Sequence, residues 1–335
     1  MRRRSLLIAA PAGLLALAGC GDDGKSDKAE AGDSPSPSGS PSSSAAPPPK
    51  IVDGPLPAVT AGQKFGAKPT VAKGSGDPSK DLAVKTLVAG TGRTVAENDY
   101  VQAHYLGQVW SSAKVFDNSY DRRTPLLIQL AQGQIIDGWR YALTGRKAGS
   151  RVQMAVPPTW GYGTSGNEQA GIKGTDTLVF VVDVQEVFNG KSSAKGAVVA
   201  QDDIDLPKVG TNTDGKAPSI DVPKKAAPKK LVANYVIEGD GDEVGENETV
   251  LVQYKGVLWA DGKEFDSTYS RGQLTSFSLQ QVVKGWGQGL AGKKVGSRVV
   301  IVIPPSLGYG DNPPQGSGIK KDSVLVFTVD ILAKM

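Results

Sequence analysis

Hydrophobic and polar residues alternate in short runs along most of the chain, and this period of two is typical of β-strands. In the first half, such runs span residues 82–88, 100–106, 125–130, 151–156 and 177–184. Residues 138–143 differ, because Trp139 and Leu143 stand four positions apart and would share one face of a helix. Five or six short strands with one short helix predict an α+β fold, an antiparallel sheet covered on one face.

The whole pattern occurs twice. Phe116 and Asp117 recur as Phe265 and Asp266, 149 positions later. Further along, the spacing falls to 147, so the second copy is two residues shorter between the corresponding leucines and the helix. A period this long indicates two copies of one domain, not a solenoid repeat.

The repeat sets the expected domain boundaries. Domain one is expected at residues 51–188 and opens with an irregular arm that runs to residue 80. A linker and a second arm follow at residues 189–228, and domain two at residues 229–335. The lysines at 223–230 are interpreted as a solvated segment and not as a site for polyanions.

The first 19 residues are similar to a signal peptide, with arginine at positions 2–4 followed by an apolar run of 13 residues. A membrane-spanning helix needs about 20. The run ends in Leu-Ala-Gly-Cys20, which resembles a bacterial lipobox and implies cleavage before Cys20 and acylation of this residue; the alternative is a free thiol. Residues 20–50 are rich in Ser and Pro and predict a disordered tether, although Pro-rich segments also serve as ligands of recognition modules.

Composition excludes several classes of function. The net charge of +4 becomes +1 without the three N-terminal arginines, which gives no electrostatic footprint for nucleic acid. The one histidine, His104, is replaced by Gln253 in the second copy, so no His-based catalytic or metal site is present twice. His104 is therefore expected to be an outward strand residue. The chain has no phosphate-binding glycine loop followed by Lys-Ser/Thr, and we expect no cofactor and no metal.

The residues that the two copies share are mainly aromatic. In the first copy this set is Tyr105, Phe116, Trp139, Tyr162 and Phe180, with Ile136 and Ile172. It predicts an apolar ligand pocket, and the alternative is a plain hydrophobic core. Asp117 and Arg122 favour the pocket, because a charged pair repeated among aromatic residues needs a polar role.

The order of the repeated motifs resembles the FKBP-type peptidyl-prolyl cis/trans isomerases. Both copies contain, in sequence, Tyr-x-Gly, Phe-Asp-x, an arginine, a Gly-Trp pair, a Pro-x-x-x-Tyr-Gly turn and Leu-Val-Phe, over roughly residues 81–188 and 229–335. The resemblance implies two tandem domains, each a curved antiparallel sheet wrapped around one short helix, that isomerise X–Pro bonds. Together with the lipobox it implies a lipoprotein on the outer face of a bacterial cytoplasmic membrane, which assists the folding of secreted or cell-surface proteins.

The resemblance also implies roles for individual residues. The floor under the proline ring would be Trp139 and Trp286. The walls would be Tyr105, Phe116 and Phe180 in domain one, and Tyr254, Phe265 and Phe327 in domain two. The carboxylates that polarise the surroundings of the bound amide would be Asp117 and Asp266. Substrate carbonyls would be held by the hydroxyls of Tyr162 and Tyr309 and by the backbone N–H groups of Ile136 and Val283. Further substrate contacts are expected from Arg122, Leu126, Ile128, Ile172, Arg271, Phe277 and Ile319.

The expected partners are proline-containing unfolded or folding polypeptides, and inhibitors of the macrolide class such as tacrolimus and rapamycin. Leu126 and Ile128 stand where the family usually has aromatic residues, which bears on macrolide affinity more than on isomerisation. The chain is expected to be a monomer, attached to the membrane through Cys20. The alternative function is a non-catalytic chaperone or peptide-binding module that uses the same pockets.

The two domains are expected to be unequal, with domain one the better isomerase. Domain two lacks two residues, including the counterpart of Gly133, just before the segment that offers the Val283 N–H. A shortened loop is expected to displace this donor, and catalysis is sensitive to shifts of about 1 Å. Val283 is also smaller than Ile136, so it would cover less of the proline ring. Phe277 is a competing feature, because domain one has only Ile128 at that position.

Overall fold

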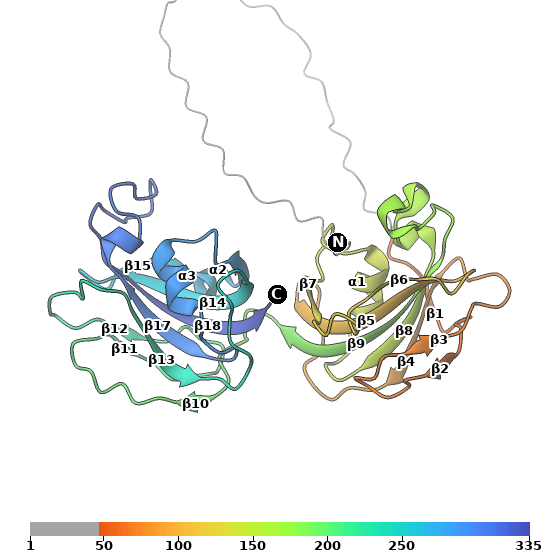
Figure 1. Ribbon diagram of the computed structural model, residues 1–335, viewed down its shortest axis with the longest axis horizontal. Coiled ribbons are helices and arrows are strands. Elements are labelled where there is room, and N and C mark those ends of the chain that lie inside the picture. The colour runs from red at the N-terminus through yellow and green to blue at the C-terminus, as the bar shows by residue number, and fades with distance from the viewer. Residues whose placement is uncertain (1–46) are drawn as a thin grey trace, which may run out of the picture.

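The computed structural model describes residues 47–335. Two lobes lie next to each other, and each consists of a curved sheet with a short helix against it (Figure 1). The lobe at the right of the figure is domain one and the lobe at the left is domain two. The predicted signal peptide, Cys20 and the tether up to residue 46 lie outside the described residues. Within residues 47–335, no helix is both long enough and apolar enough to cross a membrane.

Domain one contains a seven-stranded sheet in the order β1-β4-β8-β9-β5-β6, with β7 paired to β5. All pairs are antiparallel except β1 with β4. The strands are β1 (Ile51–Val52), β4 (Leu82–Val88), β5 (Tyr100–Val109), β6 (Val115–Asn118), β7 (Leu126–Gln129), β8 (Arg151–Val156) and β9 (Leu178–Phe188). The helix is α1 (Asp137–Leu143), and three short 3₁₀ turns follow β8 at Pro158–Trp160, Gly163–Ser165 and Glu168–Ala170. The predicted strands and helix are confirmed, whereas β1 and β6 were not predicted.

Domain two repeats this arrangement in the order β10-β13-β17-β18-β14-β15, with β16 paired to β14. Its strands are β10 (Ala197–Val198), β13 (Val232–Glu238), β14 (Thr249–Leu258), β15 (Glu264–Ser267), β16 (Thr275–Ser278), β17 (Arg298–Ile303) and β18 (Leu325–Lys334). Its helices are α3 (Lys284–Leu290), which corresponds to α1, and one additional turn, α2 (Thr268–Arg271); a 3₁₀ turn lies at Pro305–Leu307. The α+β fold of two tandem domains is therefore confirmed, with one more helical turn than expected.

The repeated Gly-Trp pair explains how each helix lies on its sheet. A Cβ atom on Gly138 would come within 2.4 Å of Val156 Cγ1, and one on Gly285 within 2.4 Å of Ile303 Cγ2. Glycine therefore lets the first turn of the helix contact the strand directly. The tryptophan that follows is then buried against the sheet, with 1% of Trp139 and 3% of Trp286 exposed.

The other face of each sheet is covered as well, although the sequence predicted cover on one face. In domain one the cover is arm one, residues 51–80, whose strands β2 (Val59–Ala61) and β3 (Thr70–Val71) form a small hairpin. Val71 packs there with Trp110 and with outward-facing residues of the sheet. In domain two it is arm two, residues 199–228, with β11 (Lys208–Val209) and β12 (Ile220–Asp221).

A buried ion pair holds arm one to its sheet, and the sequence analysis did not identify it. Arg151 and Asp183 stand opposite each other on β8 and β9, and both side chains are 0% exposed. Arg151 Nε and Nη2 donate to the Asp183 carboxylate over 2.6 and 2.7 Å. The guanidinium also donates to the backbone carbonyls of Gly62 and Ala67 in the arm.

Domain two has the same ion pair, formed by Arg298 and Asp330 over 2.6 and 2.7 Å. Arg298 donates to the carbonyls of Gly210 and Asn212 in arm two, both over 2.8 Å. Asp330 also accepts the backbone N–H of Ala194 over 2.9 Å. The segment between the domains is thus bonded to the ion pair of domain two.

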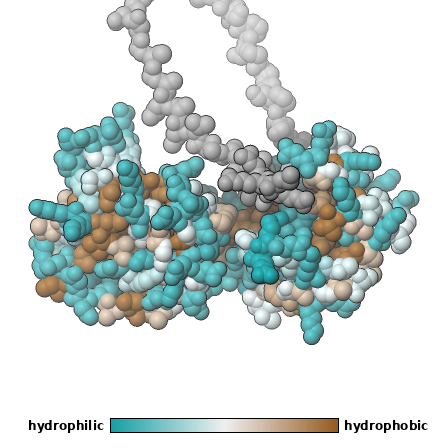
Figure 2. Space-filling model, viewed as in Figure 1, coloured by the Kyte–Doolittle hydropathy of each residue, from teal (hydrophilic) through white to brown (hydrophobic). Residues whose placement is uncertain are grey.

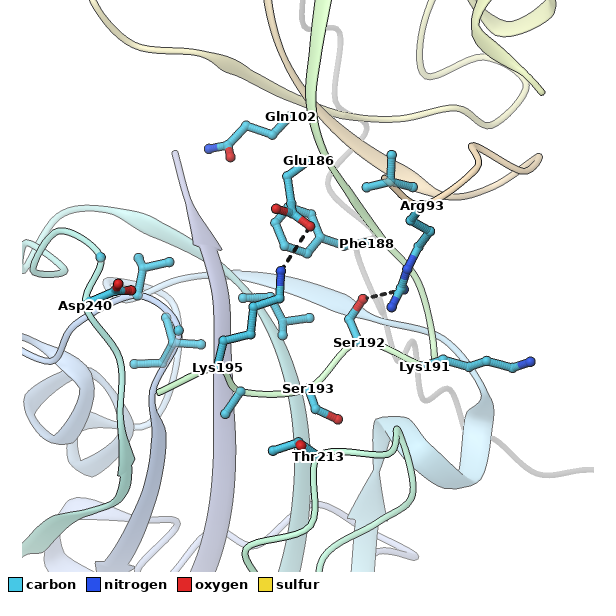
Figure 3. Close-up of a pocket in the computed structure, with 17 residues that line it drawn as sticks. Arg93, Gln102, Glu186, Phe188, Lys191, Ser192, Ser193, Lys195, Thr213 and Asp240 are labelled. Atoms are coloured by element: carbon cyan, nitrogen blue, oxygen red, sulfur yellow. Dashed lines mark hydrogen bonds and ion pairs between the residues drawn. The ribbon is translucent and has the colours of Figure 1, made fainter. Parts of the chain in front are cut away.

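This junction segment, residues 189–198, is more buried than its polar sequence predicted. Ser192 and Ala194 are 6% and 2% exposed. Arg93 of domain one donates to Ser192 Oγ over 2.9 Å, and Gln253 of domain two donates to the Ser192 carbonyl over the same distance. Figure 3 shows this bond from Arg93 and the contact of Lys195 with Glu186 across the junction. The segment is therefore bonded to both domains.

An apolar cluster, here called the junction cluster, joins the two sheets. Its buried members are Leu127 and Phe188 of domain one and Leu251, Leu274, Leu332 and Ala333 of domain two. The ends of β9 and β18 point toward each other at this place (Figure 1). The two domains therefore share a hydrophobic contact in addition to the bonded segment.

We predict that Asp183→Asn destabilises the chain strongly, because it leaves the Arg151 guanidinium buried without its counter-charge. The expected loss in the free energy of unfolding is about 3–5 kcal/mol, measured by urea denaturation of the full chain. Asp121→Asn is the control, because its pair with Lys68 is exposed on both sides, and such a pair contributes less than about 1 kcal/mol. Equal losses for the two variants would contradict the structural role of the buried pair.

Candidate functional site

Each domain gathers its repeated aromatic residues between the helix and the concave face of the sheet. In domain one, Tyr105 of β5, Trp139 of α1 and Phe180 of β9 are buried in one cluster. Phe116, Ile136 and Tyr162 are partly buried against the same cluster. We call this group site one, and its equivalent in domain two site two.

The aromatic rings of each site meet edge to face. The Trp139 ring lies 5.4 Å from the rings of Tyr105 and Phe180, at interplanar angles of 82° and 85°. In site two, the Trp286 ring lies 5.5 Å from Tyr254 and 5.6 Å from Phe327, at 85° and 84°. Edge-to-face contact at these distances is a favourable arrangement for aromatic pairs.

The glycine of the repeated Tyr-x-Gly motif makes room for two of these rings. A Cβ atom on Gly107 would lie 2.7 Å from Phe116 Cζ and 2.8 Å from Phe180 Cε1. The corresponding distances for Gly256 are 2.7 Å to Phe265 and 2.8 Å to Phe327. Any side chain at this position would displace the walls of the site.

A carboxylate, a tyrosine and an arginine form a hydrogen-bonded group at the edge of each site. In site one, the Tyr105 hydroxyl and the Arg122 guanidinium both donate to the Asp117 carboxylate. Arg122 Nη2 also donates to the Tyr105 oxygen over 3.1 Å. Asp117 is thereby fixed by its two partners.

Site two has the same group, in which Tyr254 and Arg271 donate to Asp266, and Arg271 lies 3.0 Å from the Tyr254 oxygen. Burial, together with the hydrogen bond to Asp266, raises the pKa of Tyr254 to about 12. Burial likewise raises the pKa of Tyr105 above its usual value. Both hydroxyls therefore stay protonated near neutral pH and keep donating to the carboxylates.

Potential donors to a ligand lie beside the aromatic floor. Within residues 47–335, the backbone N–H groups of Ile136 and Val283 donate to no other backbone group. Tyr162 and Tyr309 are partly buried against the clusters of their sites, and burial raises the pKa of Tyr162 to about 12. These groups are of the kind that can hold carbonyl oxygens of an extended peptide.

The shorter loop of domain two does not change the backbone at its donor. Ile136 has φ −57° and ψ 138°, and Val283 has φ −56° and ψ 141°. The difference in length is confined to the turns before these residues, where Gly133 adopts a φ of 77°. The expectation that the shortened loop displaces Val283 therefore finds no support in its backbone torsions.

Site two encloses a hollow of about 290 Å³. It is lined by Tyr254, Phe265, Asp266, Phe277, Gln281, Val282, Val283, Trp286, Tyr309 and Phe327. Of the residues predicted for this domain, Arg271 and Ile319 do not line it: Arg271 holds Asp266, and Ile319 is a buried member of the adjoining core. Gln281 and Val282 were missed, although their position directly before Val283 was a signal. Apolar patches bordered by polar side chains mark the surface of this lobe (Figure 2).

The walls of the two sites differ on one strand. Ile128 of β7 is buried with site one, and Leu126 is partly buried there. On β16, the equivalent of Ile128 is Phe277, whose ring lies 5.2 Å from Trp286. On this strand site two therefore has an aromatic ring where site one has an aliphatic side chain. Ile172 of domain one is 4% exposed and belongs to the core of site one.

His104 lies outside the aromatic set, stacked 5.0 Å from Tyr120 with Nδ1 2.9 Å from Ser119 Oγ, and burial lowers its pKa. Across the described residues, no group of three or more His, Cys, Asp or Glu side chains could hold a metal ion. The indole N–H groups of Trp139 and Trp286 are buried, and neither has a hydrogen-bond partner in this part of the chain.

Comparison with known families finds one match, which occurs twice in this chain. The family described as FKBP-type peptidyl-prolyl cis-trans isomerase matches residues 91–185 and residues 241–332. These two ranges contain the Tyr, Asp, Trp and Phe positions of site one and site two.

Several known proteins are similar to one or both copies. An "FK506-binding protein" of Streptomyces anulatus is 39% identical over 118 residues, which are 35% of this chain and 95% of that protein. The isomerase FkpA of Escherichia coli is 44% identical over 108 residues, 32% of this chain and 39% of FkpA. The isomerase FKBP10 of Mus musculus is 30% identical over 263 residues, which cover 77% of this chain but only 38% of FKBP10. The crystal structure of FkpA matches 33% of this chain and 50% of its own, at 43% identity and a TM-score of 0.30.

Proposed function

This chain belongs to the FKBP-type peptidyl-prolyl cis-trans isomerases, and on that premise we propose that both of its sites bind and turn over X–Pro segments of proteins that are folding outside the cytoplasm. The observation that carries the proposal is the pair of equivalent groups, Tyr105–Asp117–Arg122 and Tyr254–Asp266–Arg271, each beside a buried tryptophan. A hydrophobic core needs no such repeated charged group.

Rotation of a peptide bond requires neither a nucleophile nor a proton transfer. The barrier is about 18–20 kcal/mol, because the planar amide is stabilised by resonance that places negative charge on its oxygen. X–Pro bonds cross it unaided in tens to hundreds of seconds. The twisted amide has lost this resonance and carries less charge on the oxygen. A site that prefers the twisted form over the planar form lowers the barrier.

The geometry of the sites supports this preference. The proline ring would lie on Trp139 or Trp286, which are nearly fully buried. The reacting amide would then leave water, the solvent that best stabilises its planar form. The N–H of Ile136 or Val283 and the hydroxyl of Tyr162 or Tyr309 would hold carbonyls on either side of the proline. The carboxylate of Asp117 or Asp266 would face the amide whose charge changes.

Location is part of the proposal. The N-terminal apolar run and the Leu-Ala-Gly-Cys20 sequence support a lipoprotein that is anchored on the outer face of the membrane through acylated Cys20. A chain in this position would meet polypeptides as they emerge unfolded. Its clients are then secreted or cell-surface proteins with X–Pro bonds that limit their folding.

The experiment that tests the function is a proline-peptide isomerisation assay on the full chain. Two variants separate the sites. In the site-one reporter, site two is disabled by Phe265→Ala and Asp266→Ala, so that only site one is read. In the site-two reporter, site one is disabled by Phe116→Ala and Asp117→Ala. Both reporters are expected to isomerise the peptide, and tacrolimus tests whether either site also accepts a macrolide. Binding of the peptide without any acceleration of isomerisation would instead favour a peptide-holding chaperone.

We predict that the polar groups of site one contribute unequally. In the site-one reporter, Tyr162→Phe removes one hydrogen bond and is expected to lower kcat/KM about threefold, since such a bond contributes roughly 0.5–1.5 kcal/mol. Asp117→Ala leaves two donors unpaired and is expected to lower it about tenfold or more. The Tm of both variants should stay within a few degrees of the parent. A parallel loss of Tm and activity in both would mean that these residues serve only the core.

We predict that site one is the faster of the two sites, because Ile136 covers more of the proline ring than Val283 does. The measurement compares kcat/KM of the two reporters with one proline peptide. Separated halves, cut at residues 190 and 201, are unsuited to this test because the cut removes Ser192 and Ala194 from the junction. A larger kcat/KM at site two would show that Phe277 outweighs the smaller valine.

We predict that Cys20→Ala abolishes the anchor. The variant is expected in the soluble fraction or as uncleaved precursor, because the acylated side chain is missing. Membrane fractionation with an antibody to the full chain measures this, and Cys20→Ser is the matched variant that keeps the size of the residue. Fractionation identical to that of the unchanged chain would show that the protein is not held by a lipid at this residue.

A further inference from the structure

Domain two covers the back of the strand that forms one wall of site one. Leu126 and Ile128 of β7 belong to the cluster of site one, so Leu127 between them points to the other side of the strand. There Leu127 packs in the junction cluster with Leu274 and Leu332 of domain two. Only 4% of Leu127 is exposed.

The equivalent strand of domain two has no such cover. Ser276 of β16 stands at the position of Leu127, and Ser276 is exposed. The same contrast holds for a neighbour, because Phe188 of the junction cluster corresponds to Met335, which is 38% exposed. At these two positions the buried residue occurs only in domain one, so site one alone has a domain behind its wall.

β7 depends on this cover for its position. It pairs with β5 alone, through four residues, and its other edge has no strand partner within residues 47–335. A short edge strand of this kind is positioned largely by the packing of its side chains on both faces. The turn at Gly272–Leu274 of domain two reaches this edge, where it lines one hollow together with Tyr100 and Gln129.

We propose that Leu127 and Leu274 are positioning residues for site one, through which domain two holds β7 and keeps Leu126 and Ile128 against the substrate. Turnover at site one then requires the docked second domain, whereas turnover at site two does not require domain one in this way. The proposal rests on the proposed function of site one. It makes one domain of the tandem a support for the catalytic pocket of the other.

The test uses the full chain in its two reporter forms. Leu274→Ala is expected to raise KM about fivefold in the site-one reporter, with a smaller change in kcat, because the wall moves while Asp117 and Trp139 stay in place. The site-two reporter with Leu274→Ala should keep its KM within about twofold. Leu274→Met, which refills the space, should restore KM at site one. Ser276→Ala, at the matched position of β16, is the control and should change neither reporter.

A double-mutant cycle with Leu127→Ala adds a second measurement. Because both residues act through the same contact, Leu127→Ala combined with Leu274→Ala should raise KM at site one little more than either change alone. If Leu274→Ala unfolds the chain, Leu274→Val gives the same comparison with a smaller loss of volume.

The outcomes separate this proposal from the proposed function. An unchanged KM at site one in the folded Leu274→Ala chain would overturn it. Equal increases in KM at both sites would also overturn it, since they would indicate a general loss of stability. A site-one reporter that shows no isomerisation before Leu274 is changed would instead refute the proposed function of that site.

Discussion

The fold depends on one buried ion pair in each domain. A guanidinium and a carboxylate that leave water lose several kcal/mol of solvation each, so a buried pair is tolerated only when nearly all of its donors and lone pairs are used. In domain one, Arg151 meets this condition with Asp183 and with the carbonyls of Gly62 and Ala67. Asp183 meets it with Arg151, the N–H of Gly66 and the hydroxyl of Tyr120. Arm one therefore has to close over the sheet for the pair to be satisfied.

This constraint explains why each pocket opens on one face of its sheet and why the domains are docked. With the convex face sealed by an arm, the concave face with its helix is left to form a site. In domain two, Asp330 completes its bonds with the N–H of Ala194, which belongs to the junction segment. In domain one, the equivalent bond to the carboxylate comes from Gly66 of arm one. In domain two it comes from the junction segment, which is the chain that leaves domain one. Without that segment, Asp330 would keep its bonds to Arg298 and Tyr269 but lose the buried bond from the Ala194 N–H.

Most strands, the helix of each domain and most of the residues that line site two could be predicted from the sequence, because each has a local signature. The alternation of apolar residues located β4, β5, β8 and β9. Comparison of the two copies distinguished positions that are identical in both, such as Tyr105 and Trp139, from ordinary core residues. The Arg151–Asp183 pair had no such signature, because a charged residue in an alternating strand usually indicates an exposed position. The junction cluster was missed for a related reason: Leu127 reads as part of a buried run, and nothing local shows that its partners lie in the other domain. The backbone torsions at Val283 could not be predicted from the sequence, because a two-residue deletion can change either the preceding turn or the backbone at the Val283 N–H.

The two sites share their polar chemistry and differ in their apolar shape. The Tyr–Asp–Arg group and the tryptophan floor have nearly the same distances in both domains, so the action that we propose on an X–Pro amide is the same at both sites. The wall on β7 is aliphatic at Ile128, whereas the wall on β16 has the Phe277 ring, which meets the Trp286 ring edge to face. An apolar wall distinguishes side chains that differ by one methylene by only about 1–3 kcal/mol. Isoleucine and phenylalanine differ in size and shape by much more than one methylene, so we expect the two walls to prefer different residues next to the proline. The duplication would then provide one reaction with two sequence preferences, and only at site one is the selecting wall covered from behind by the neighbouring domain.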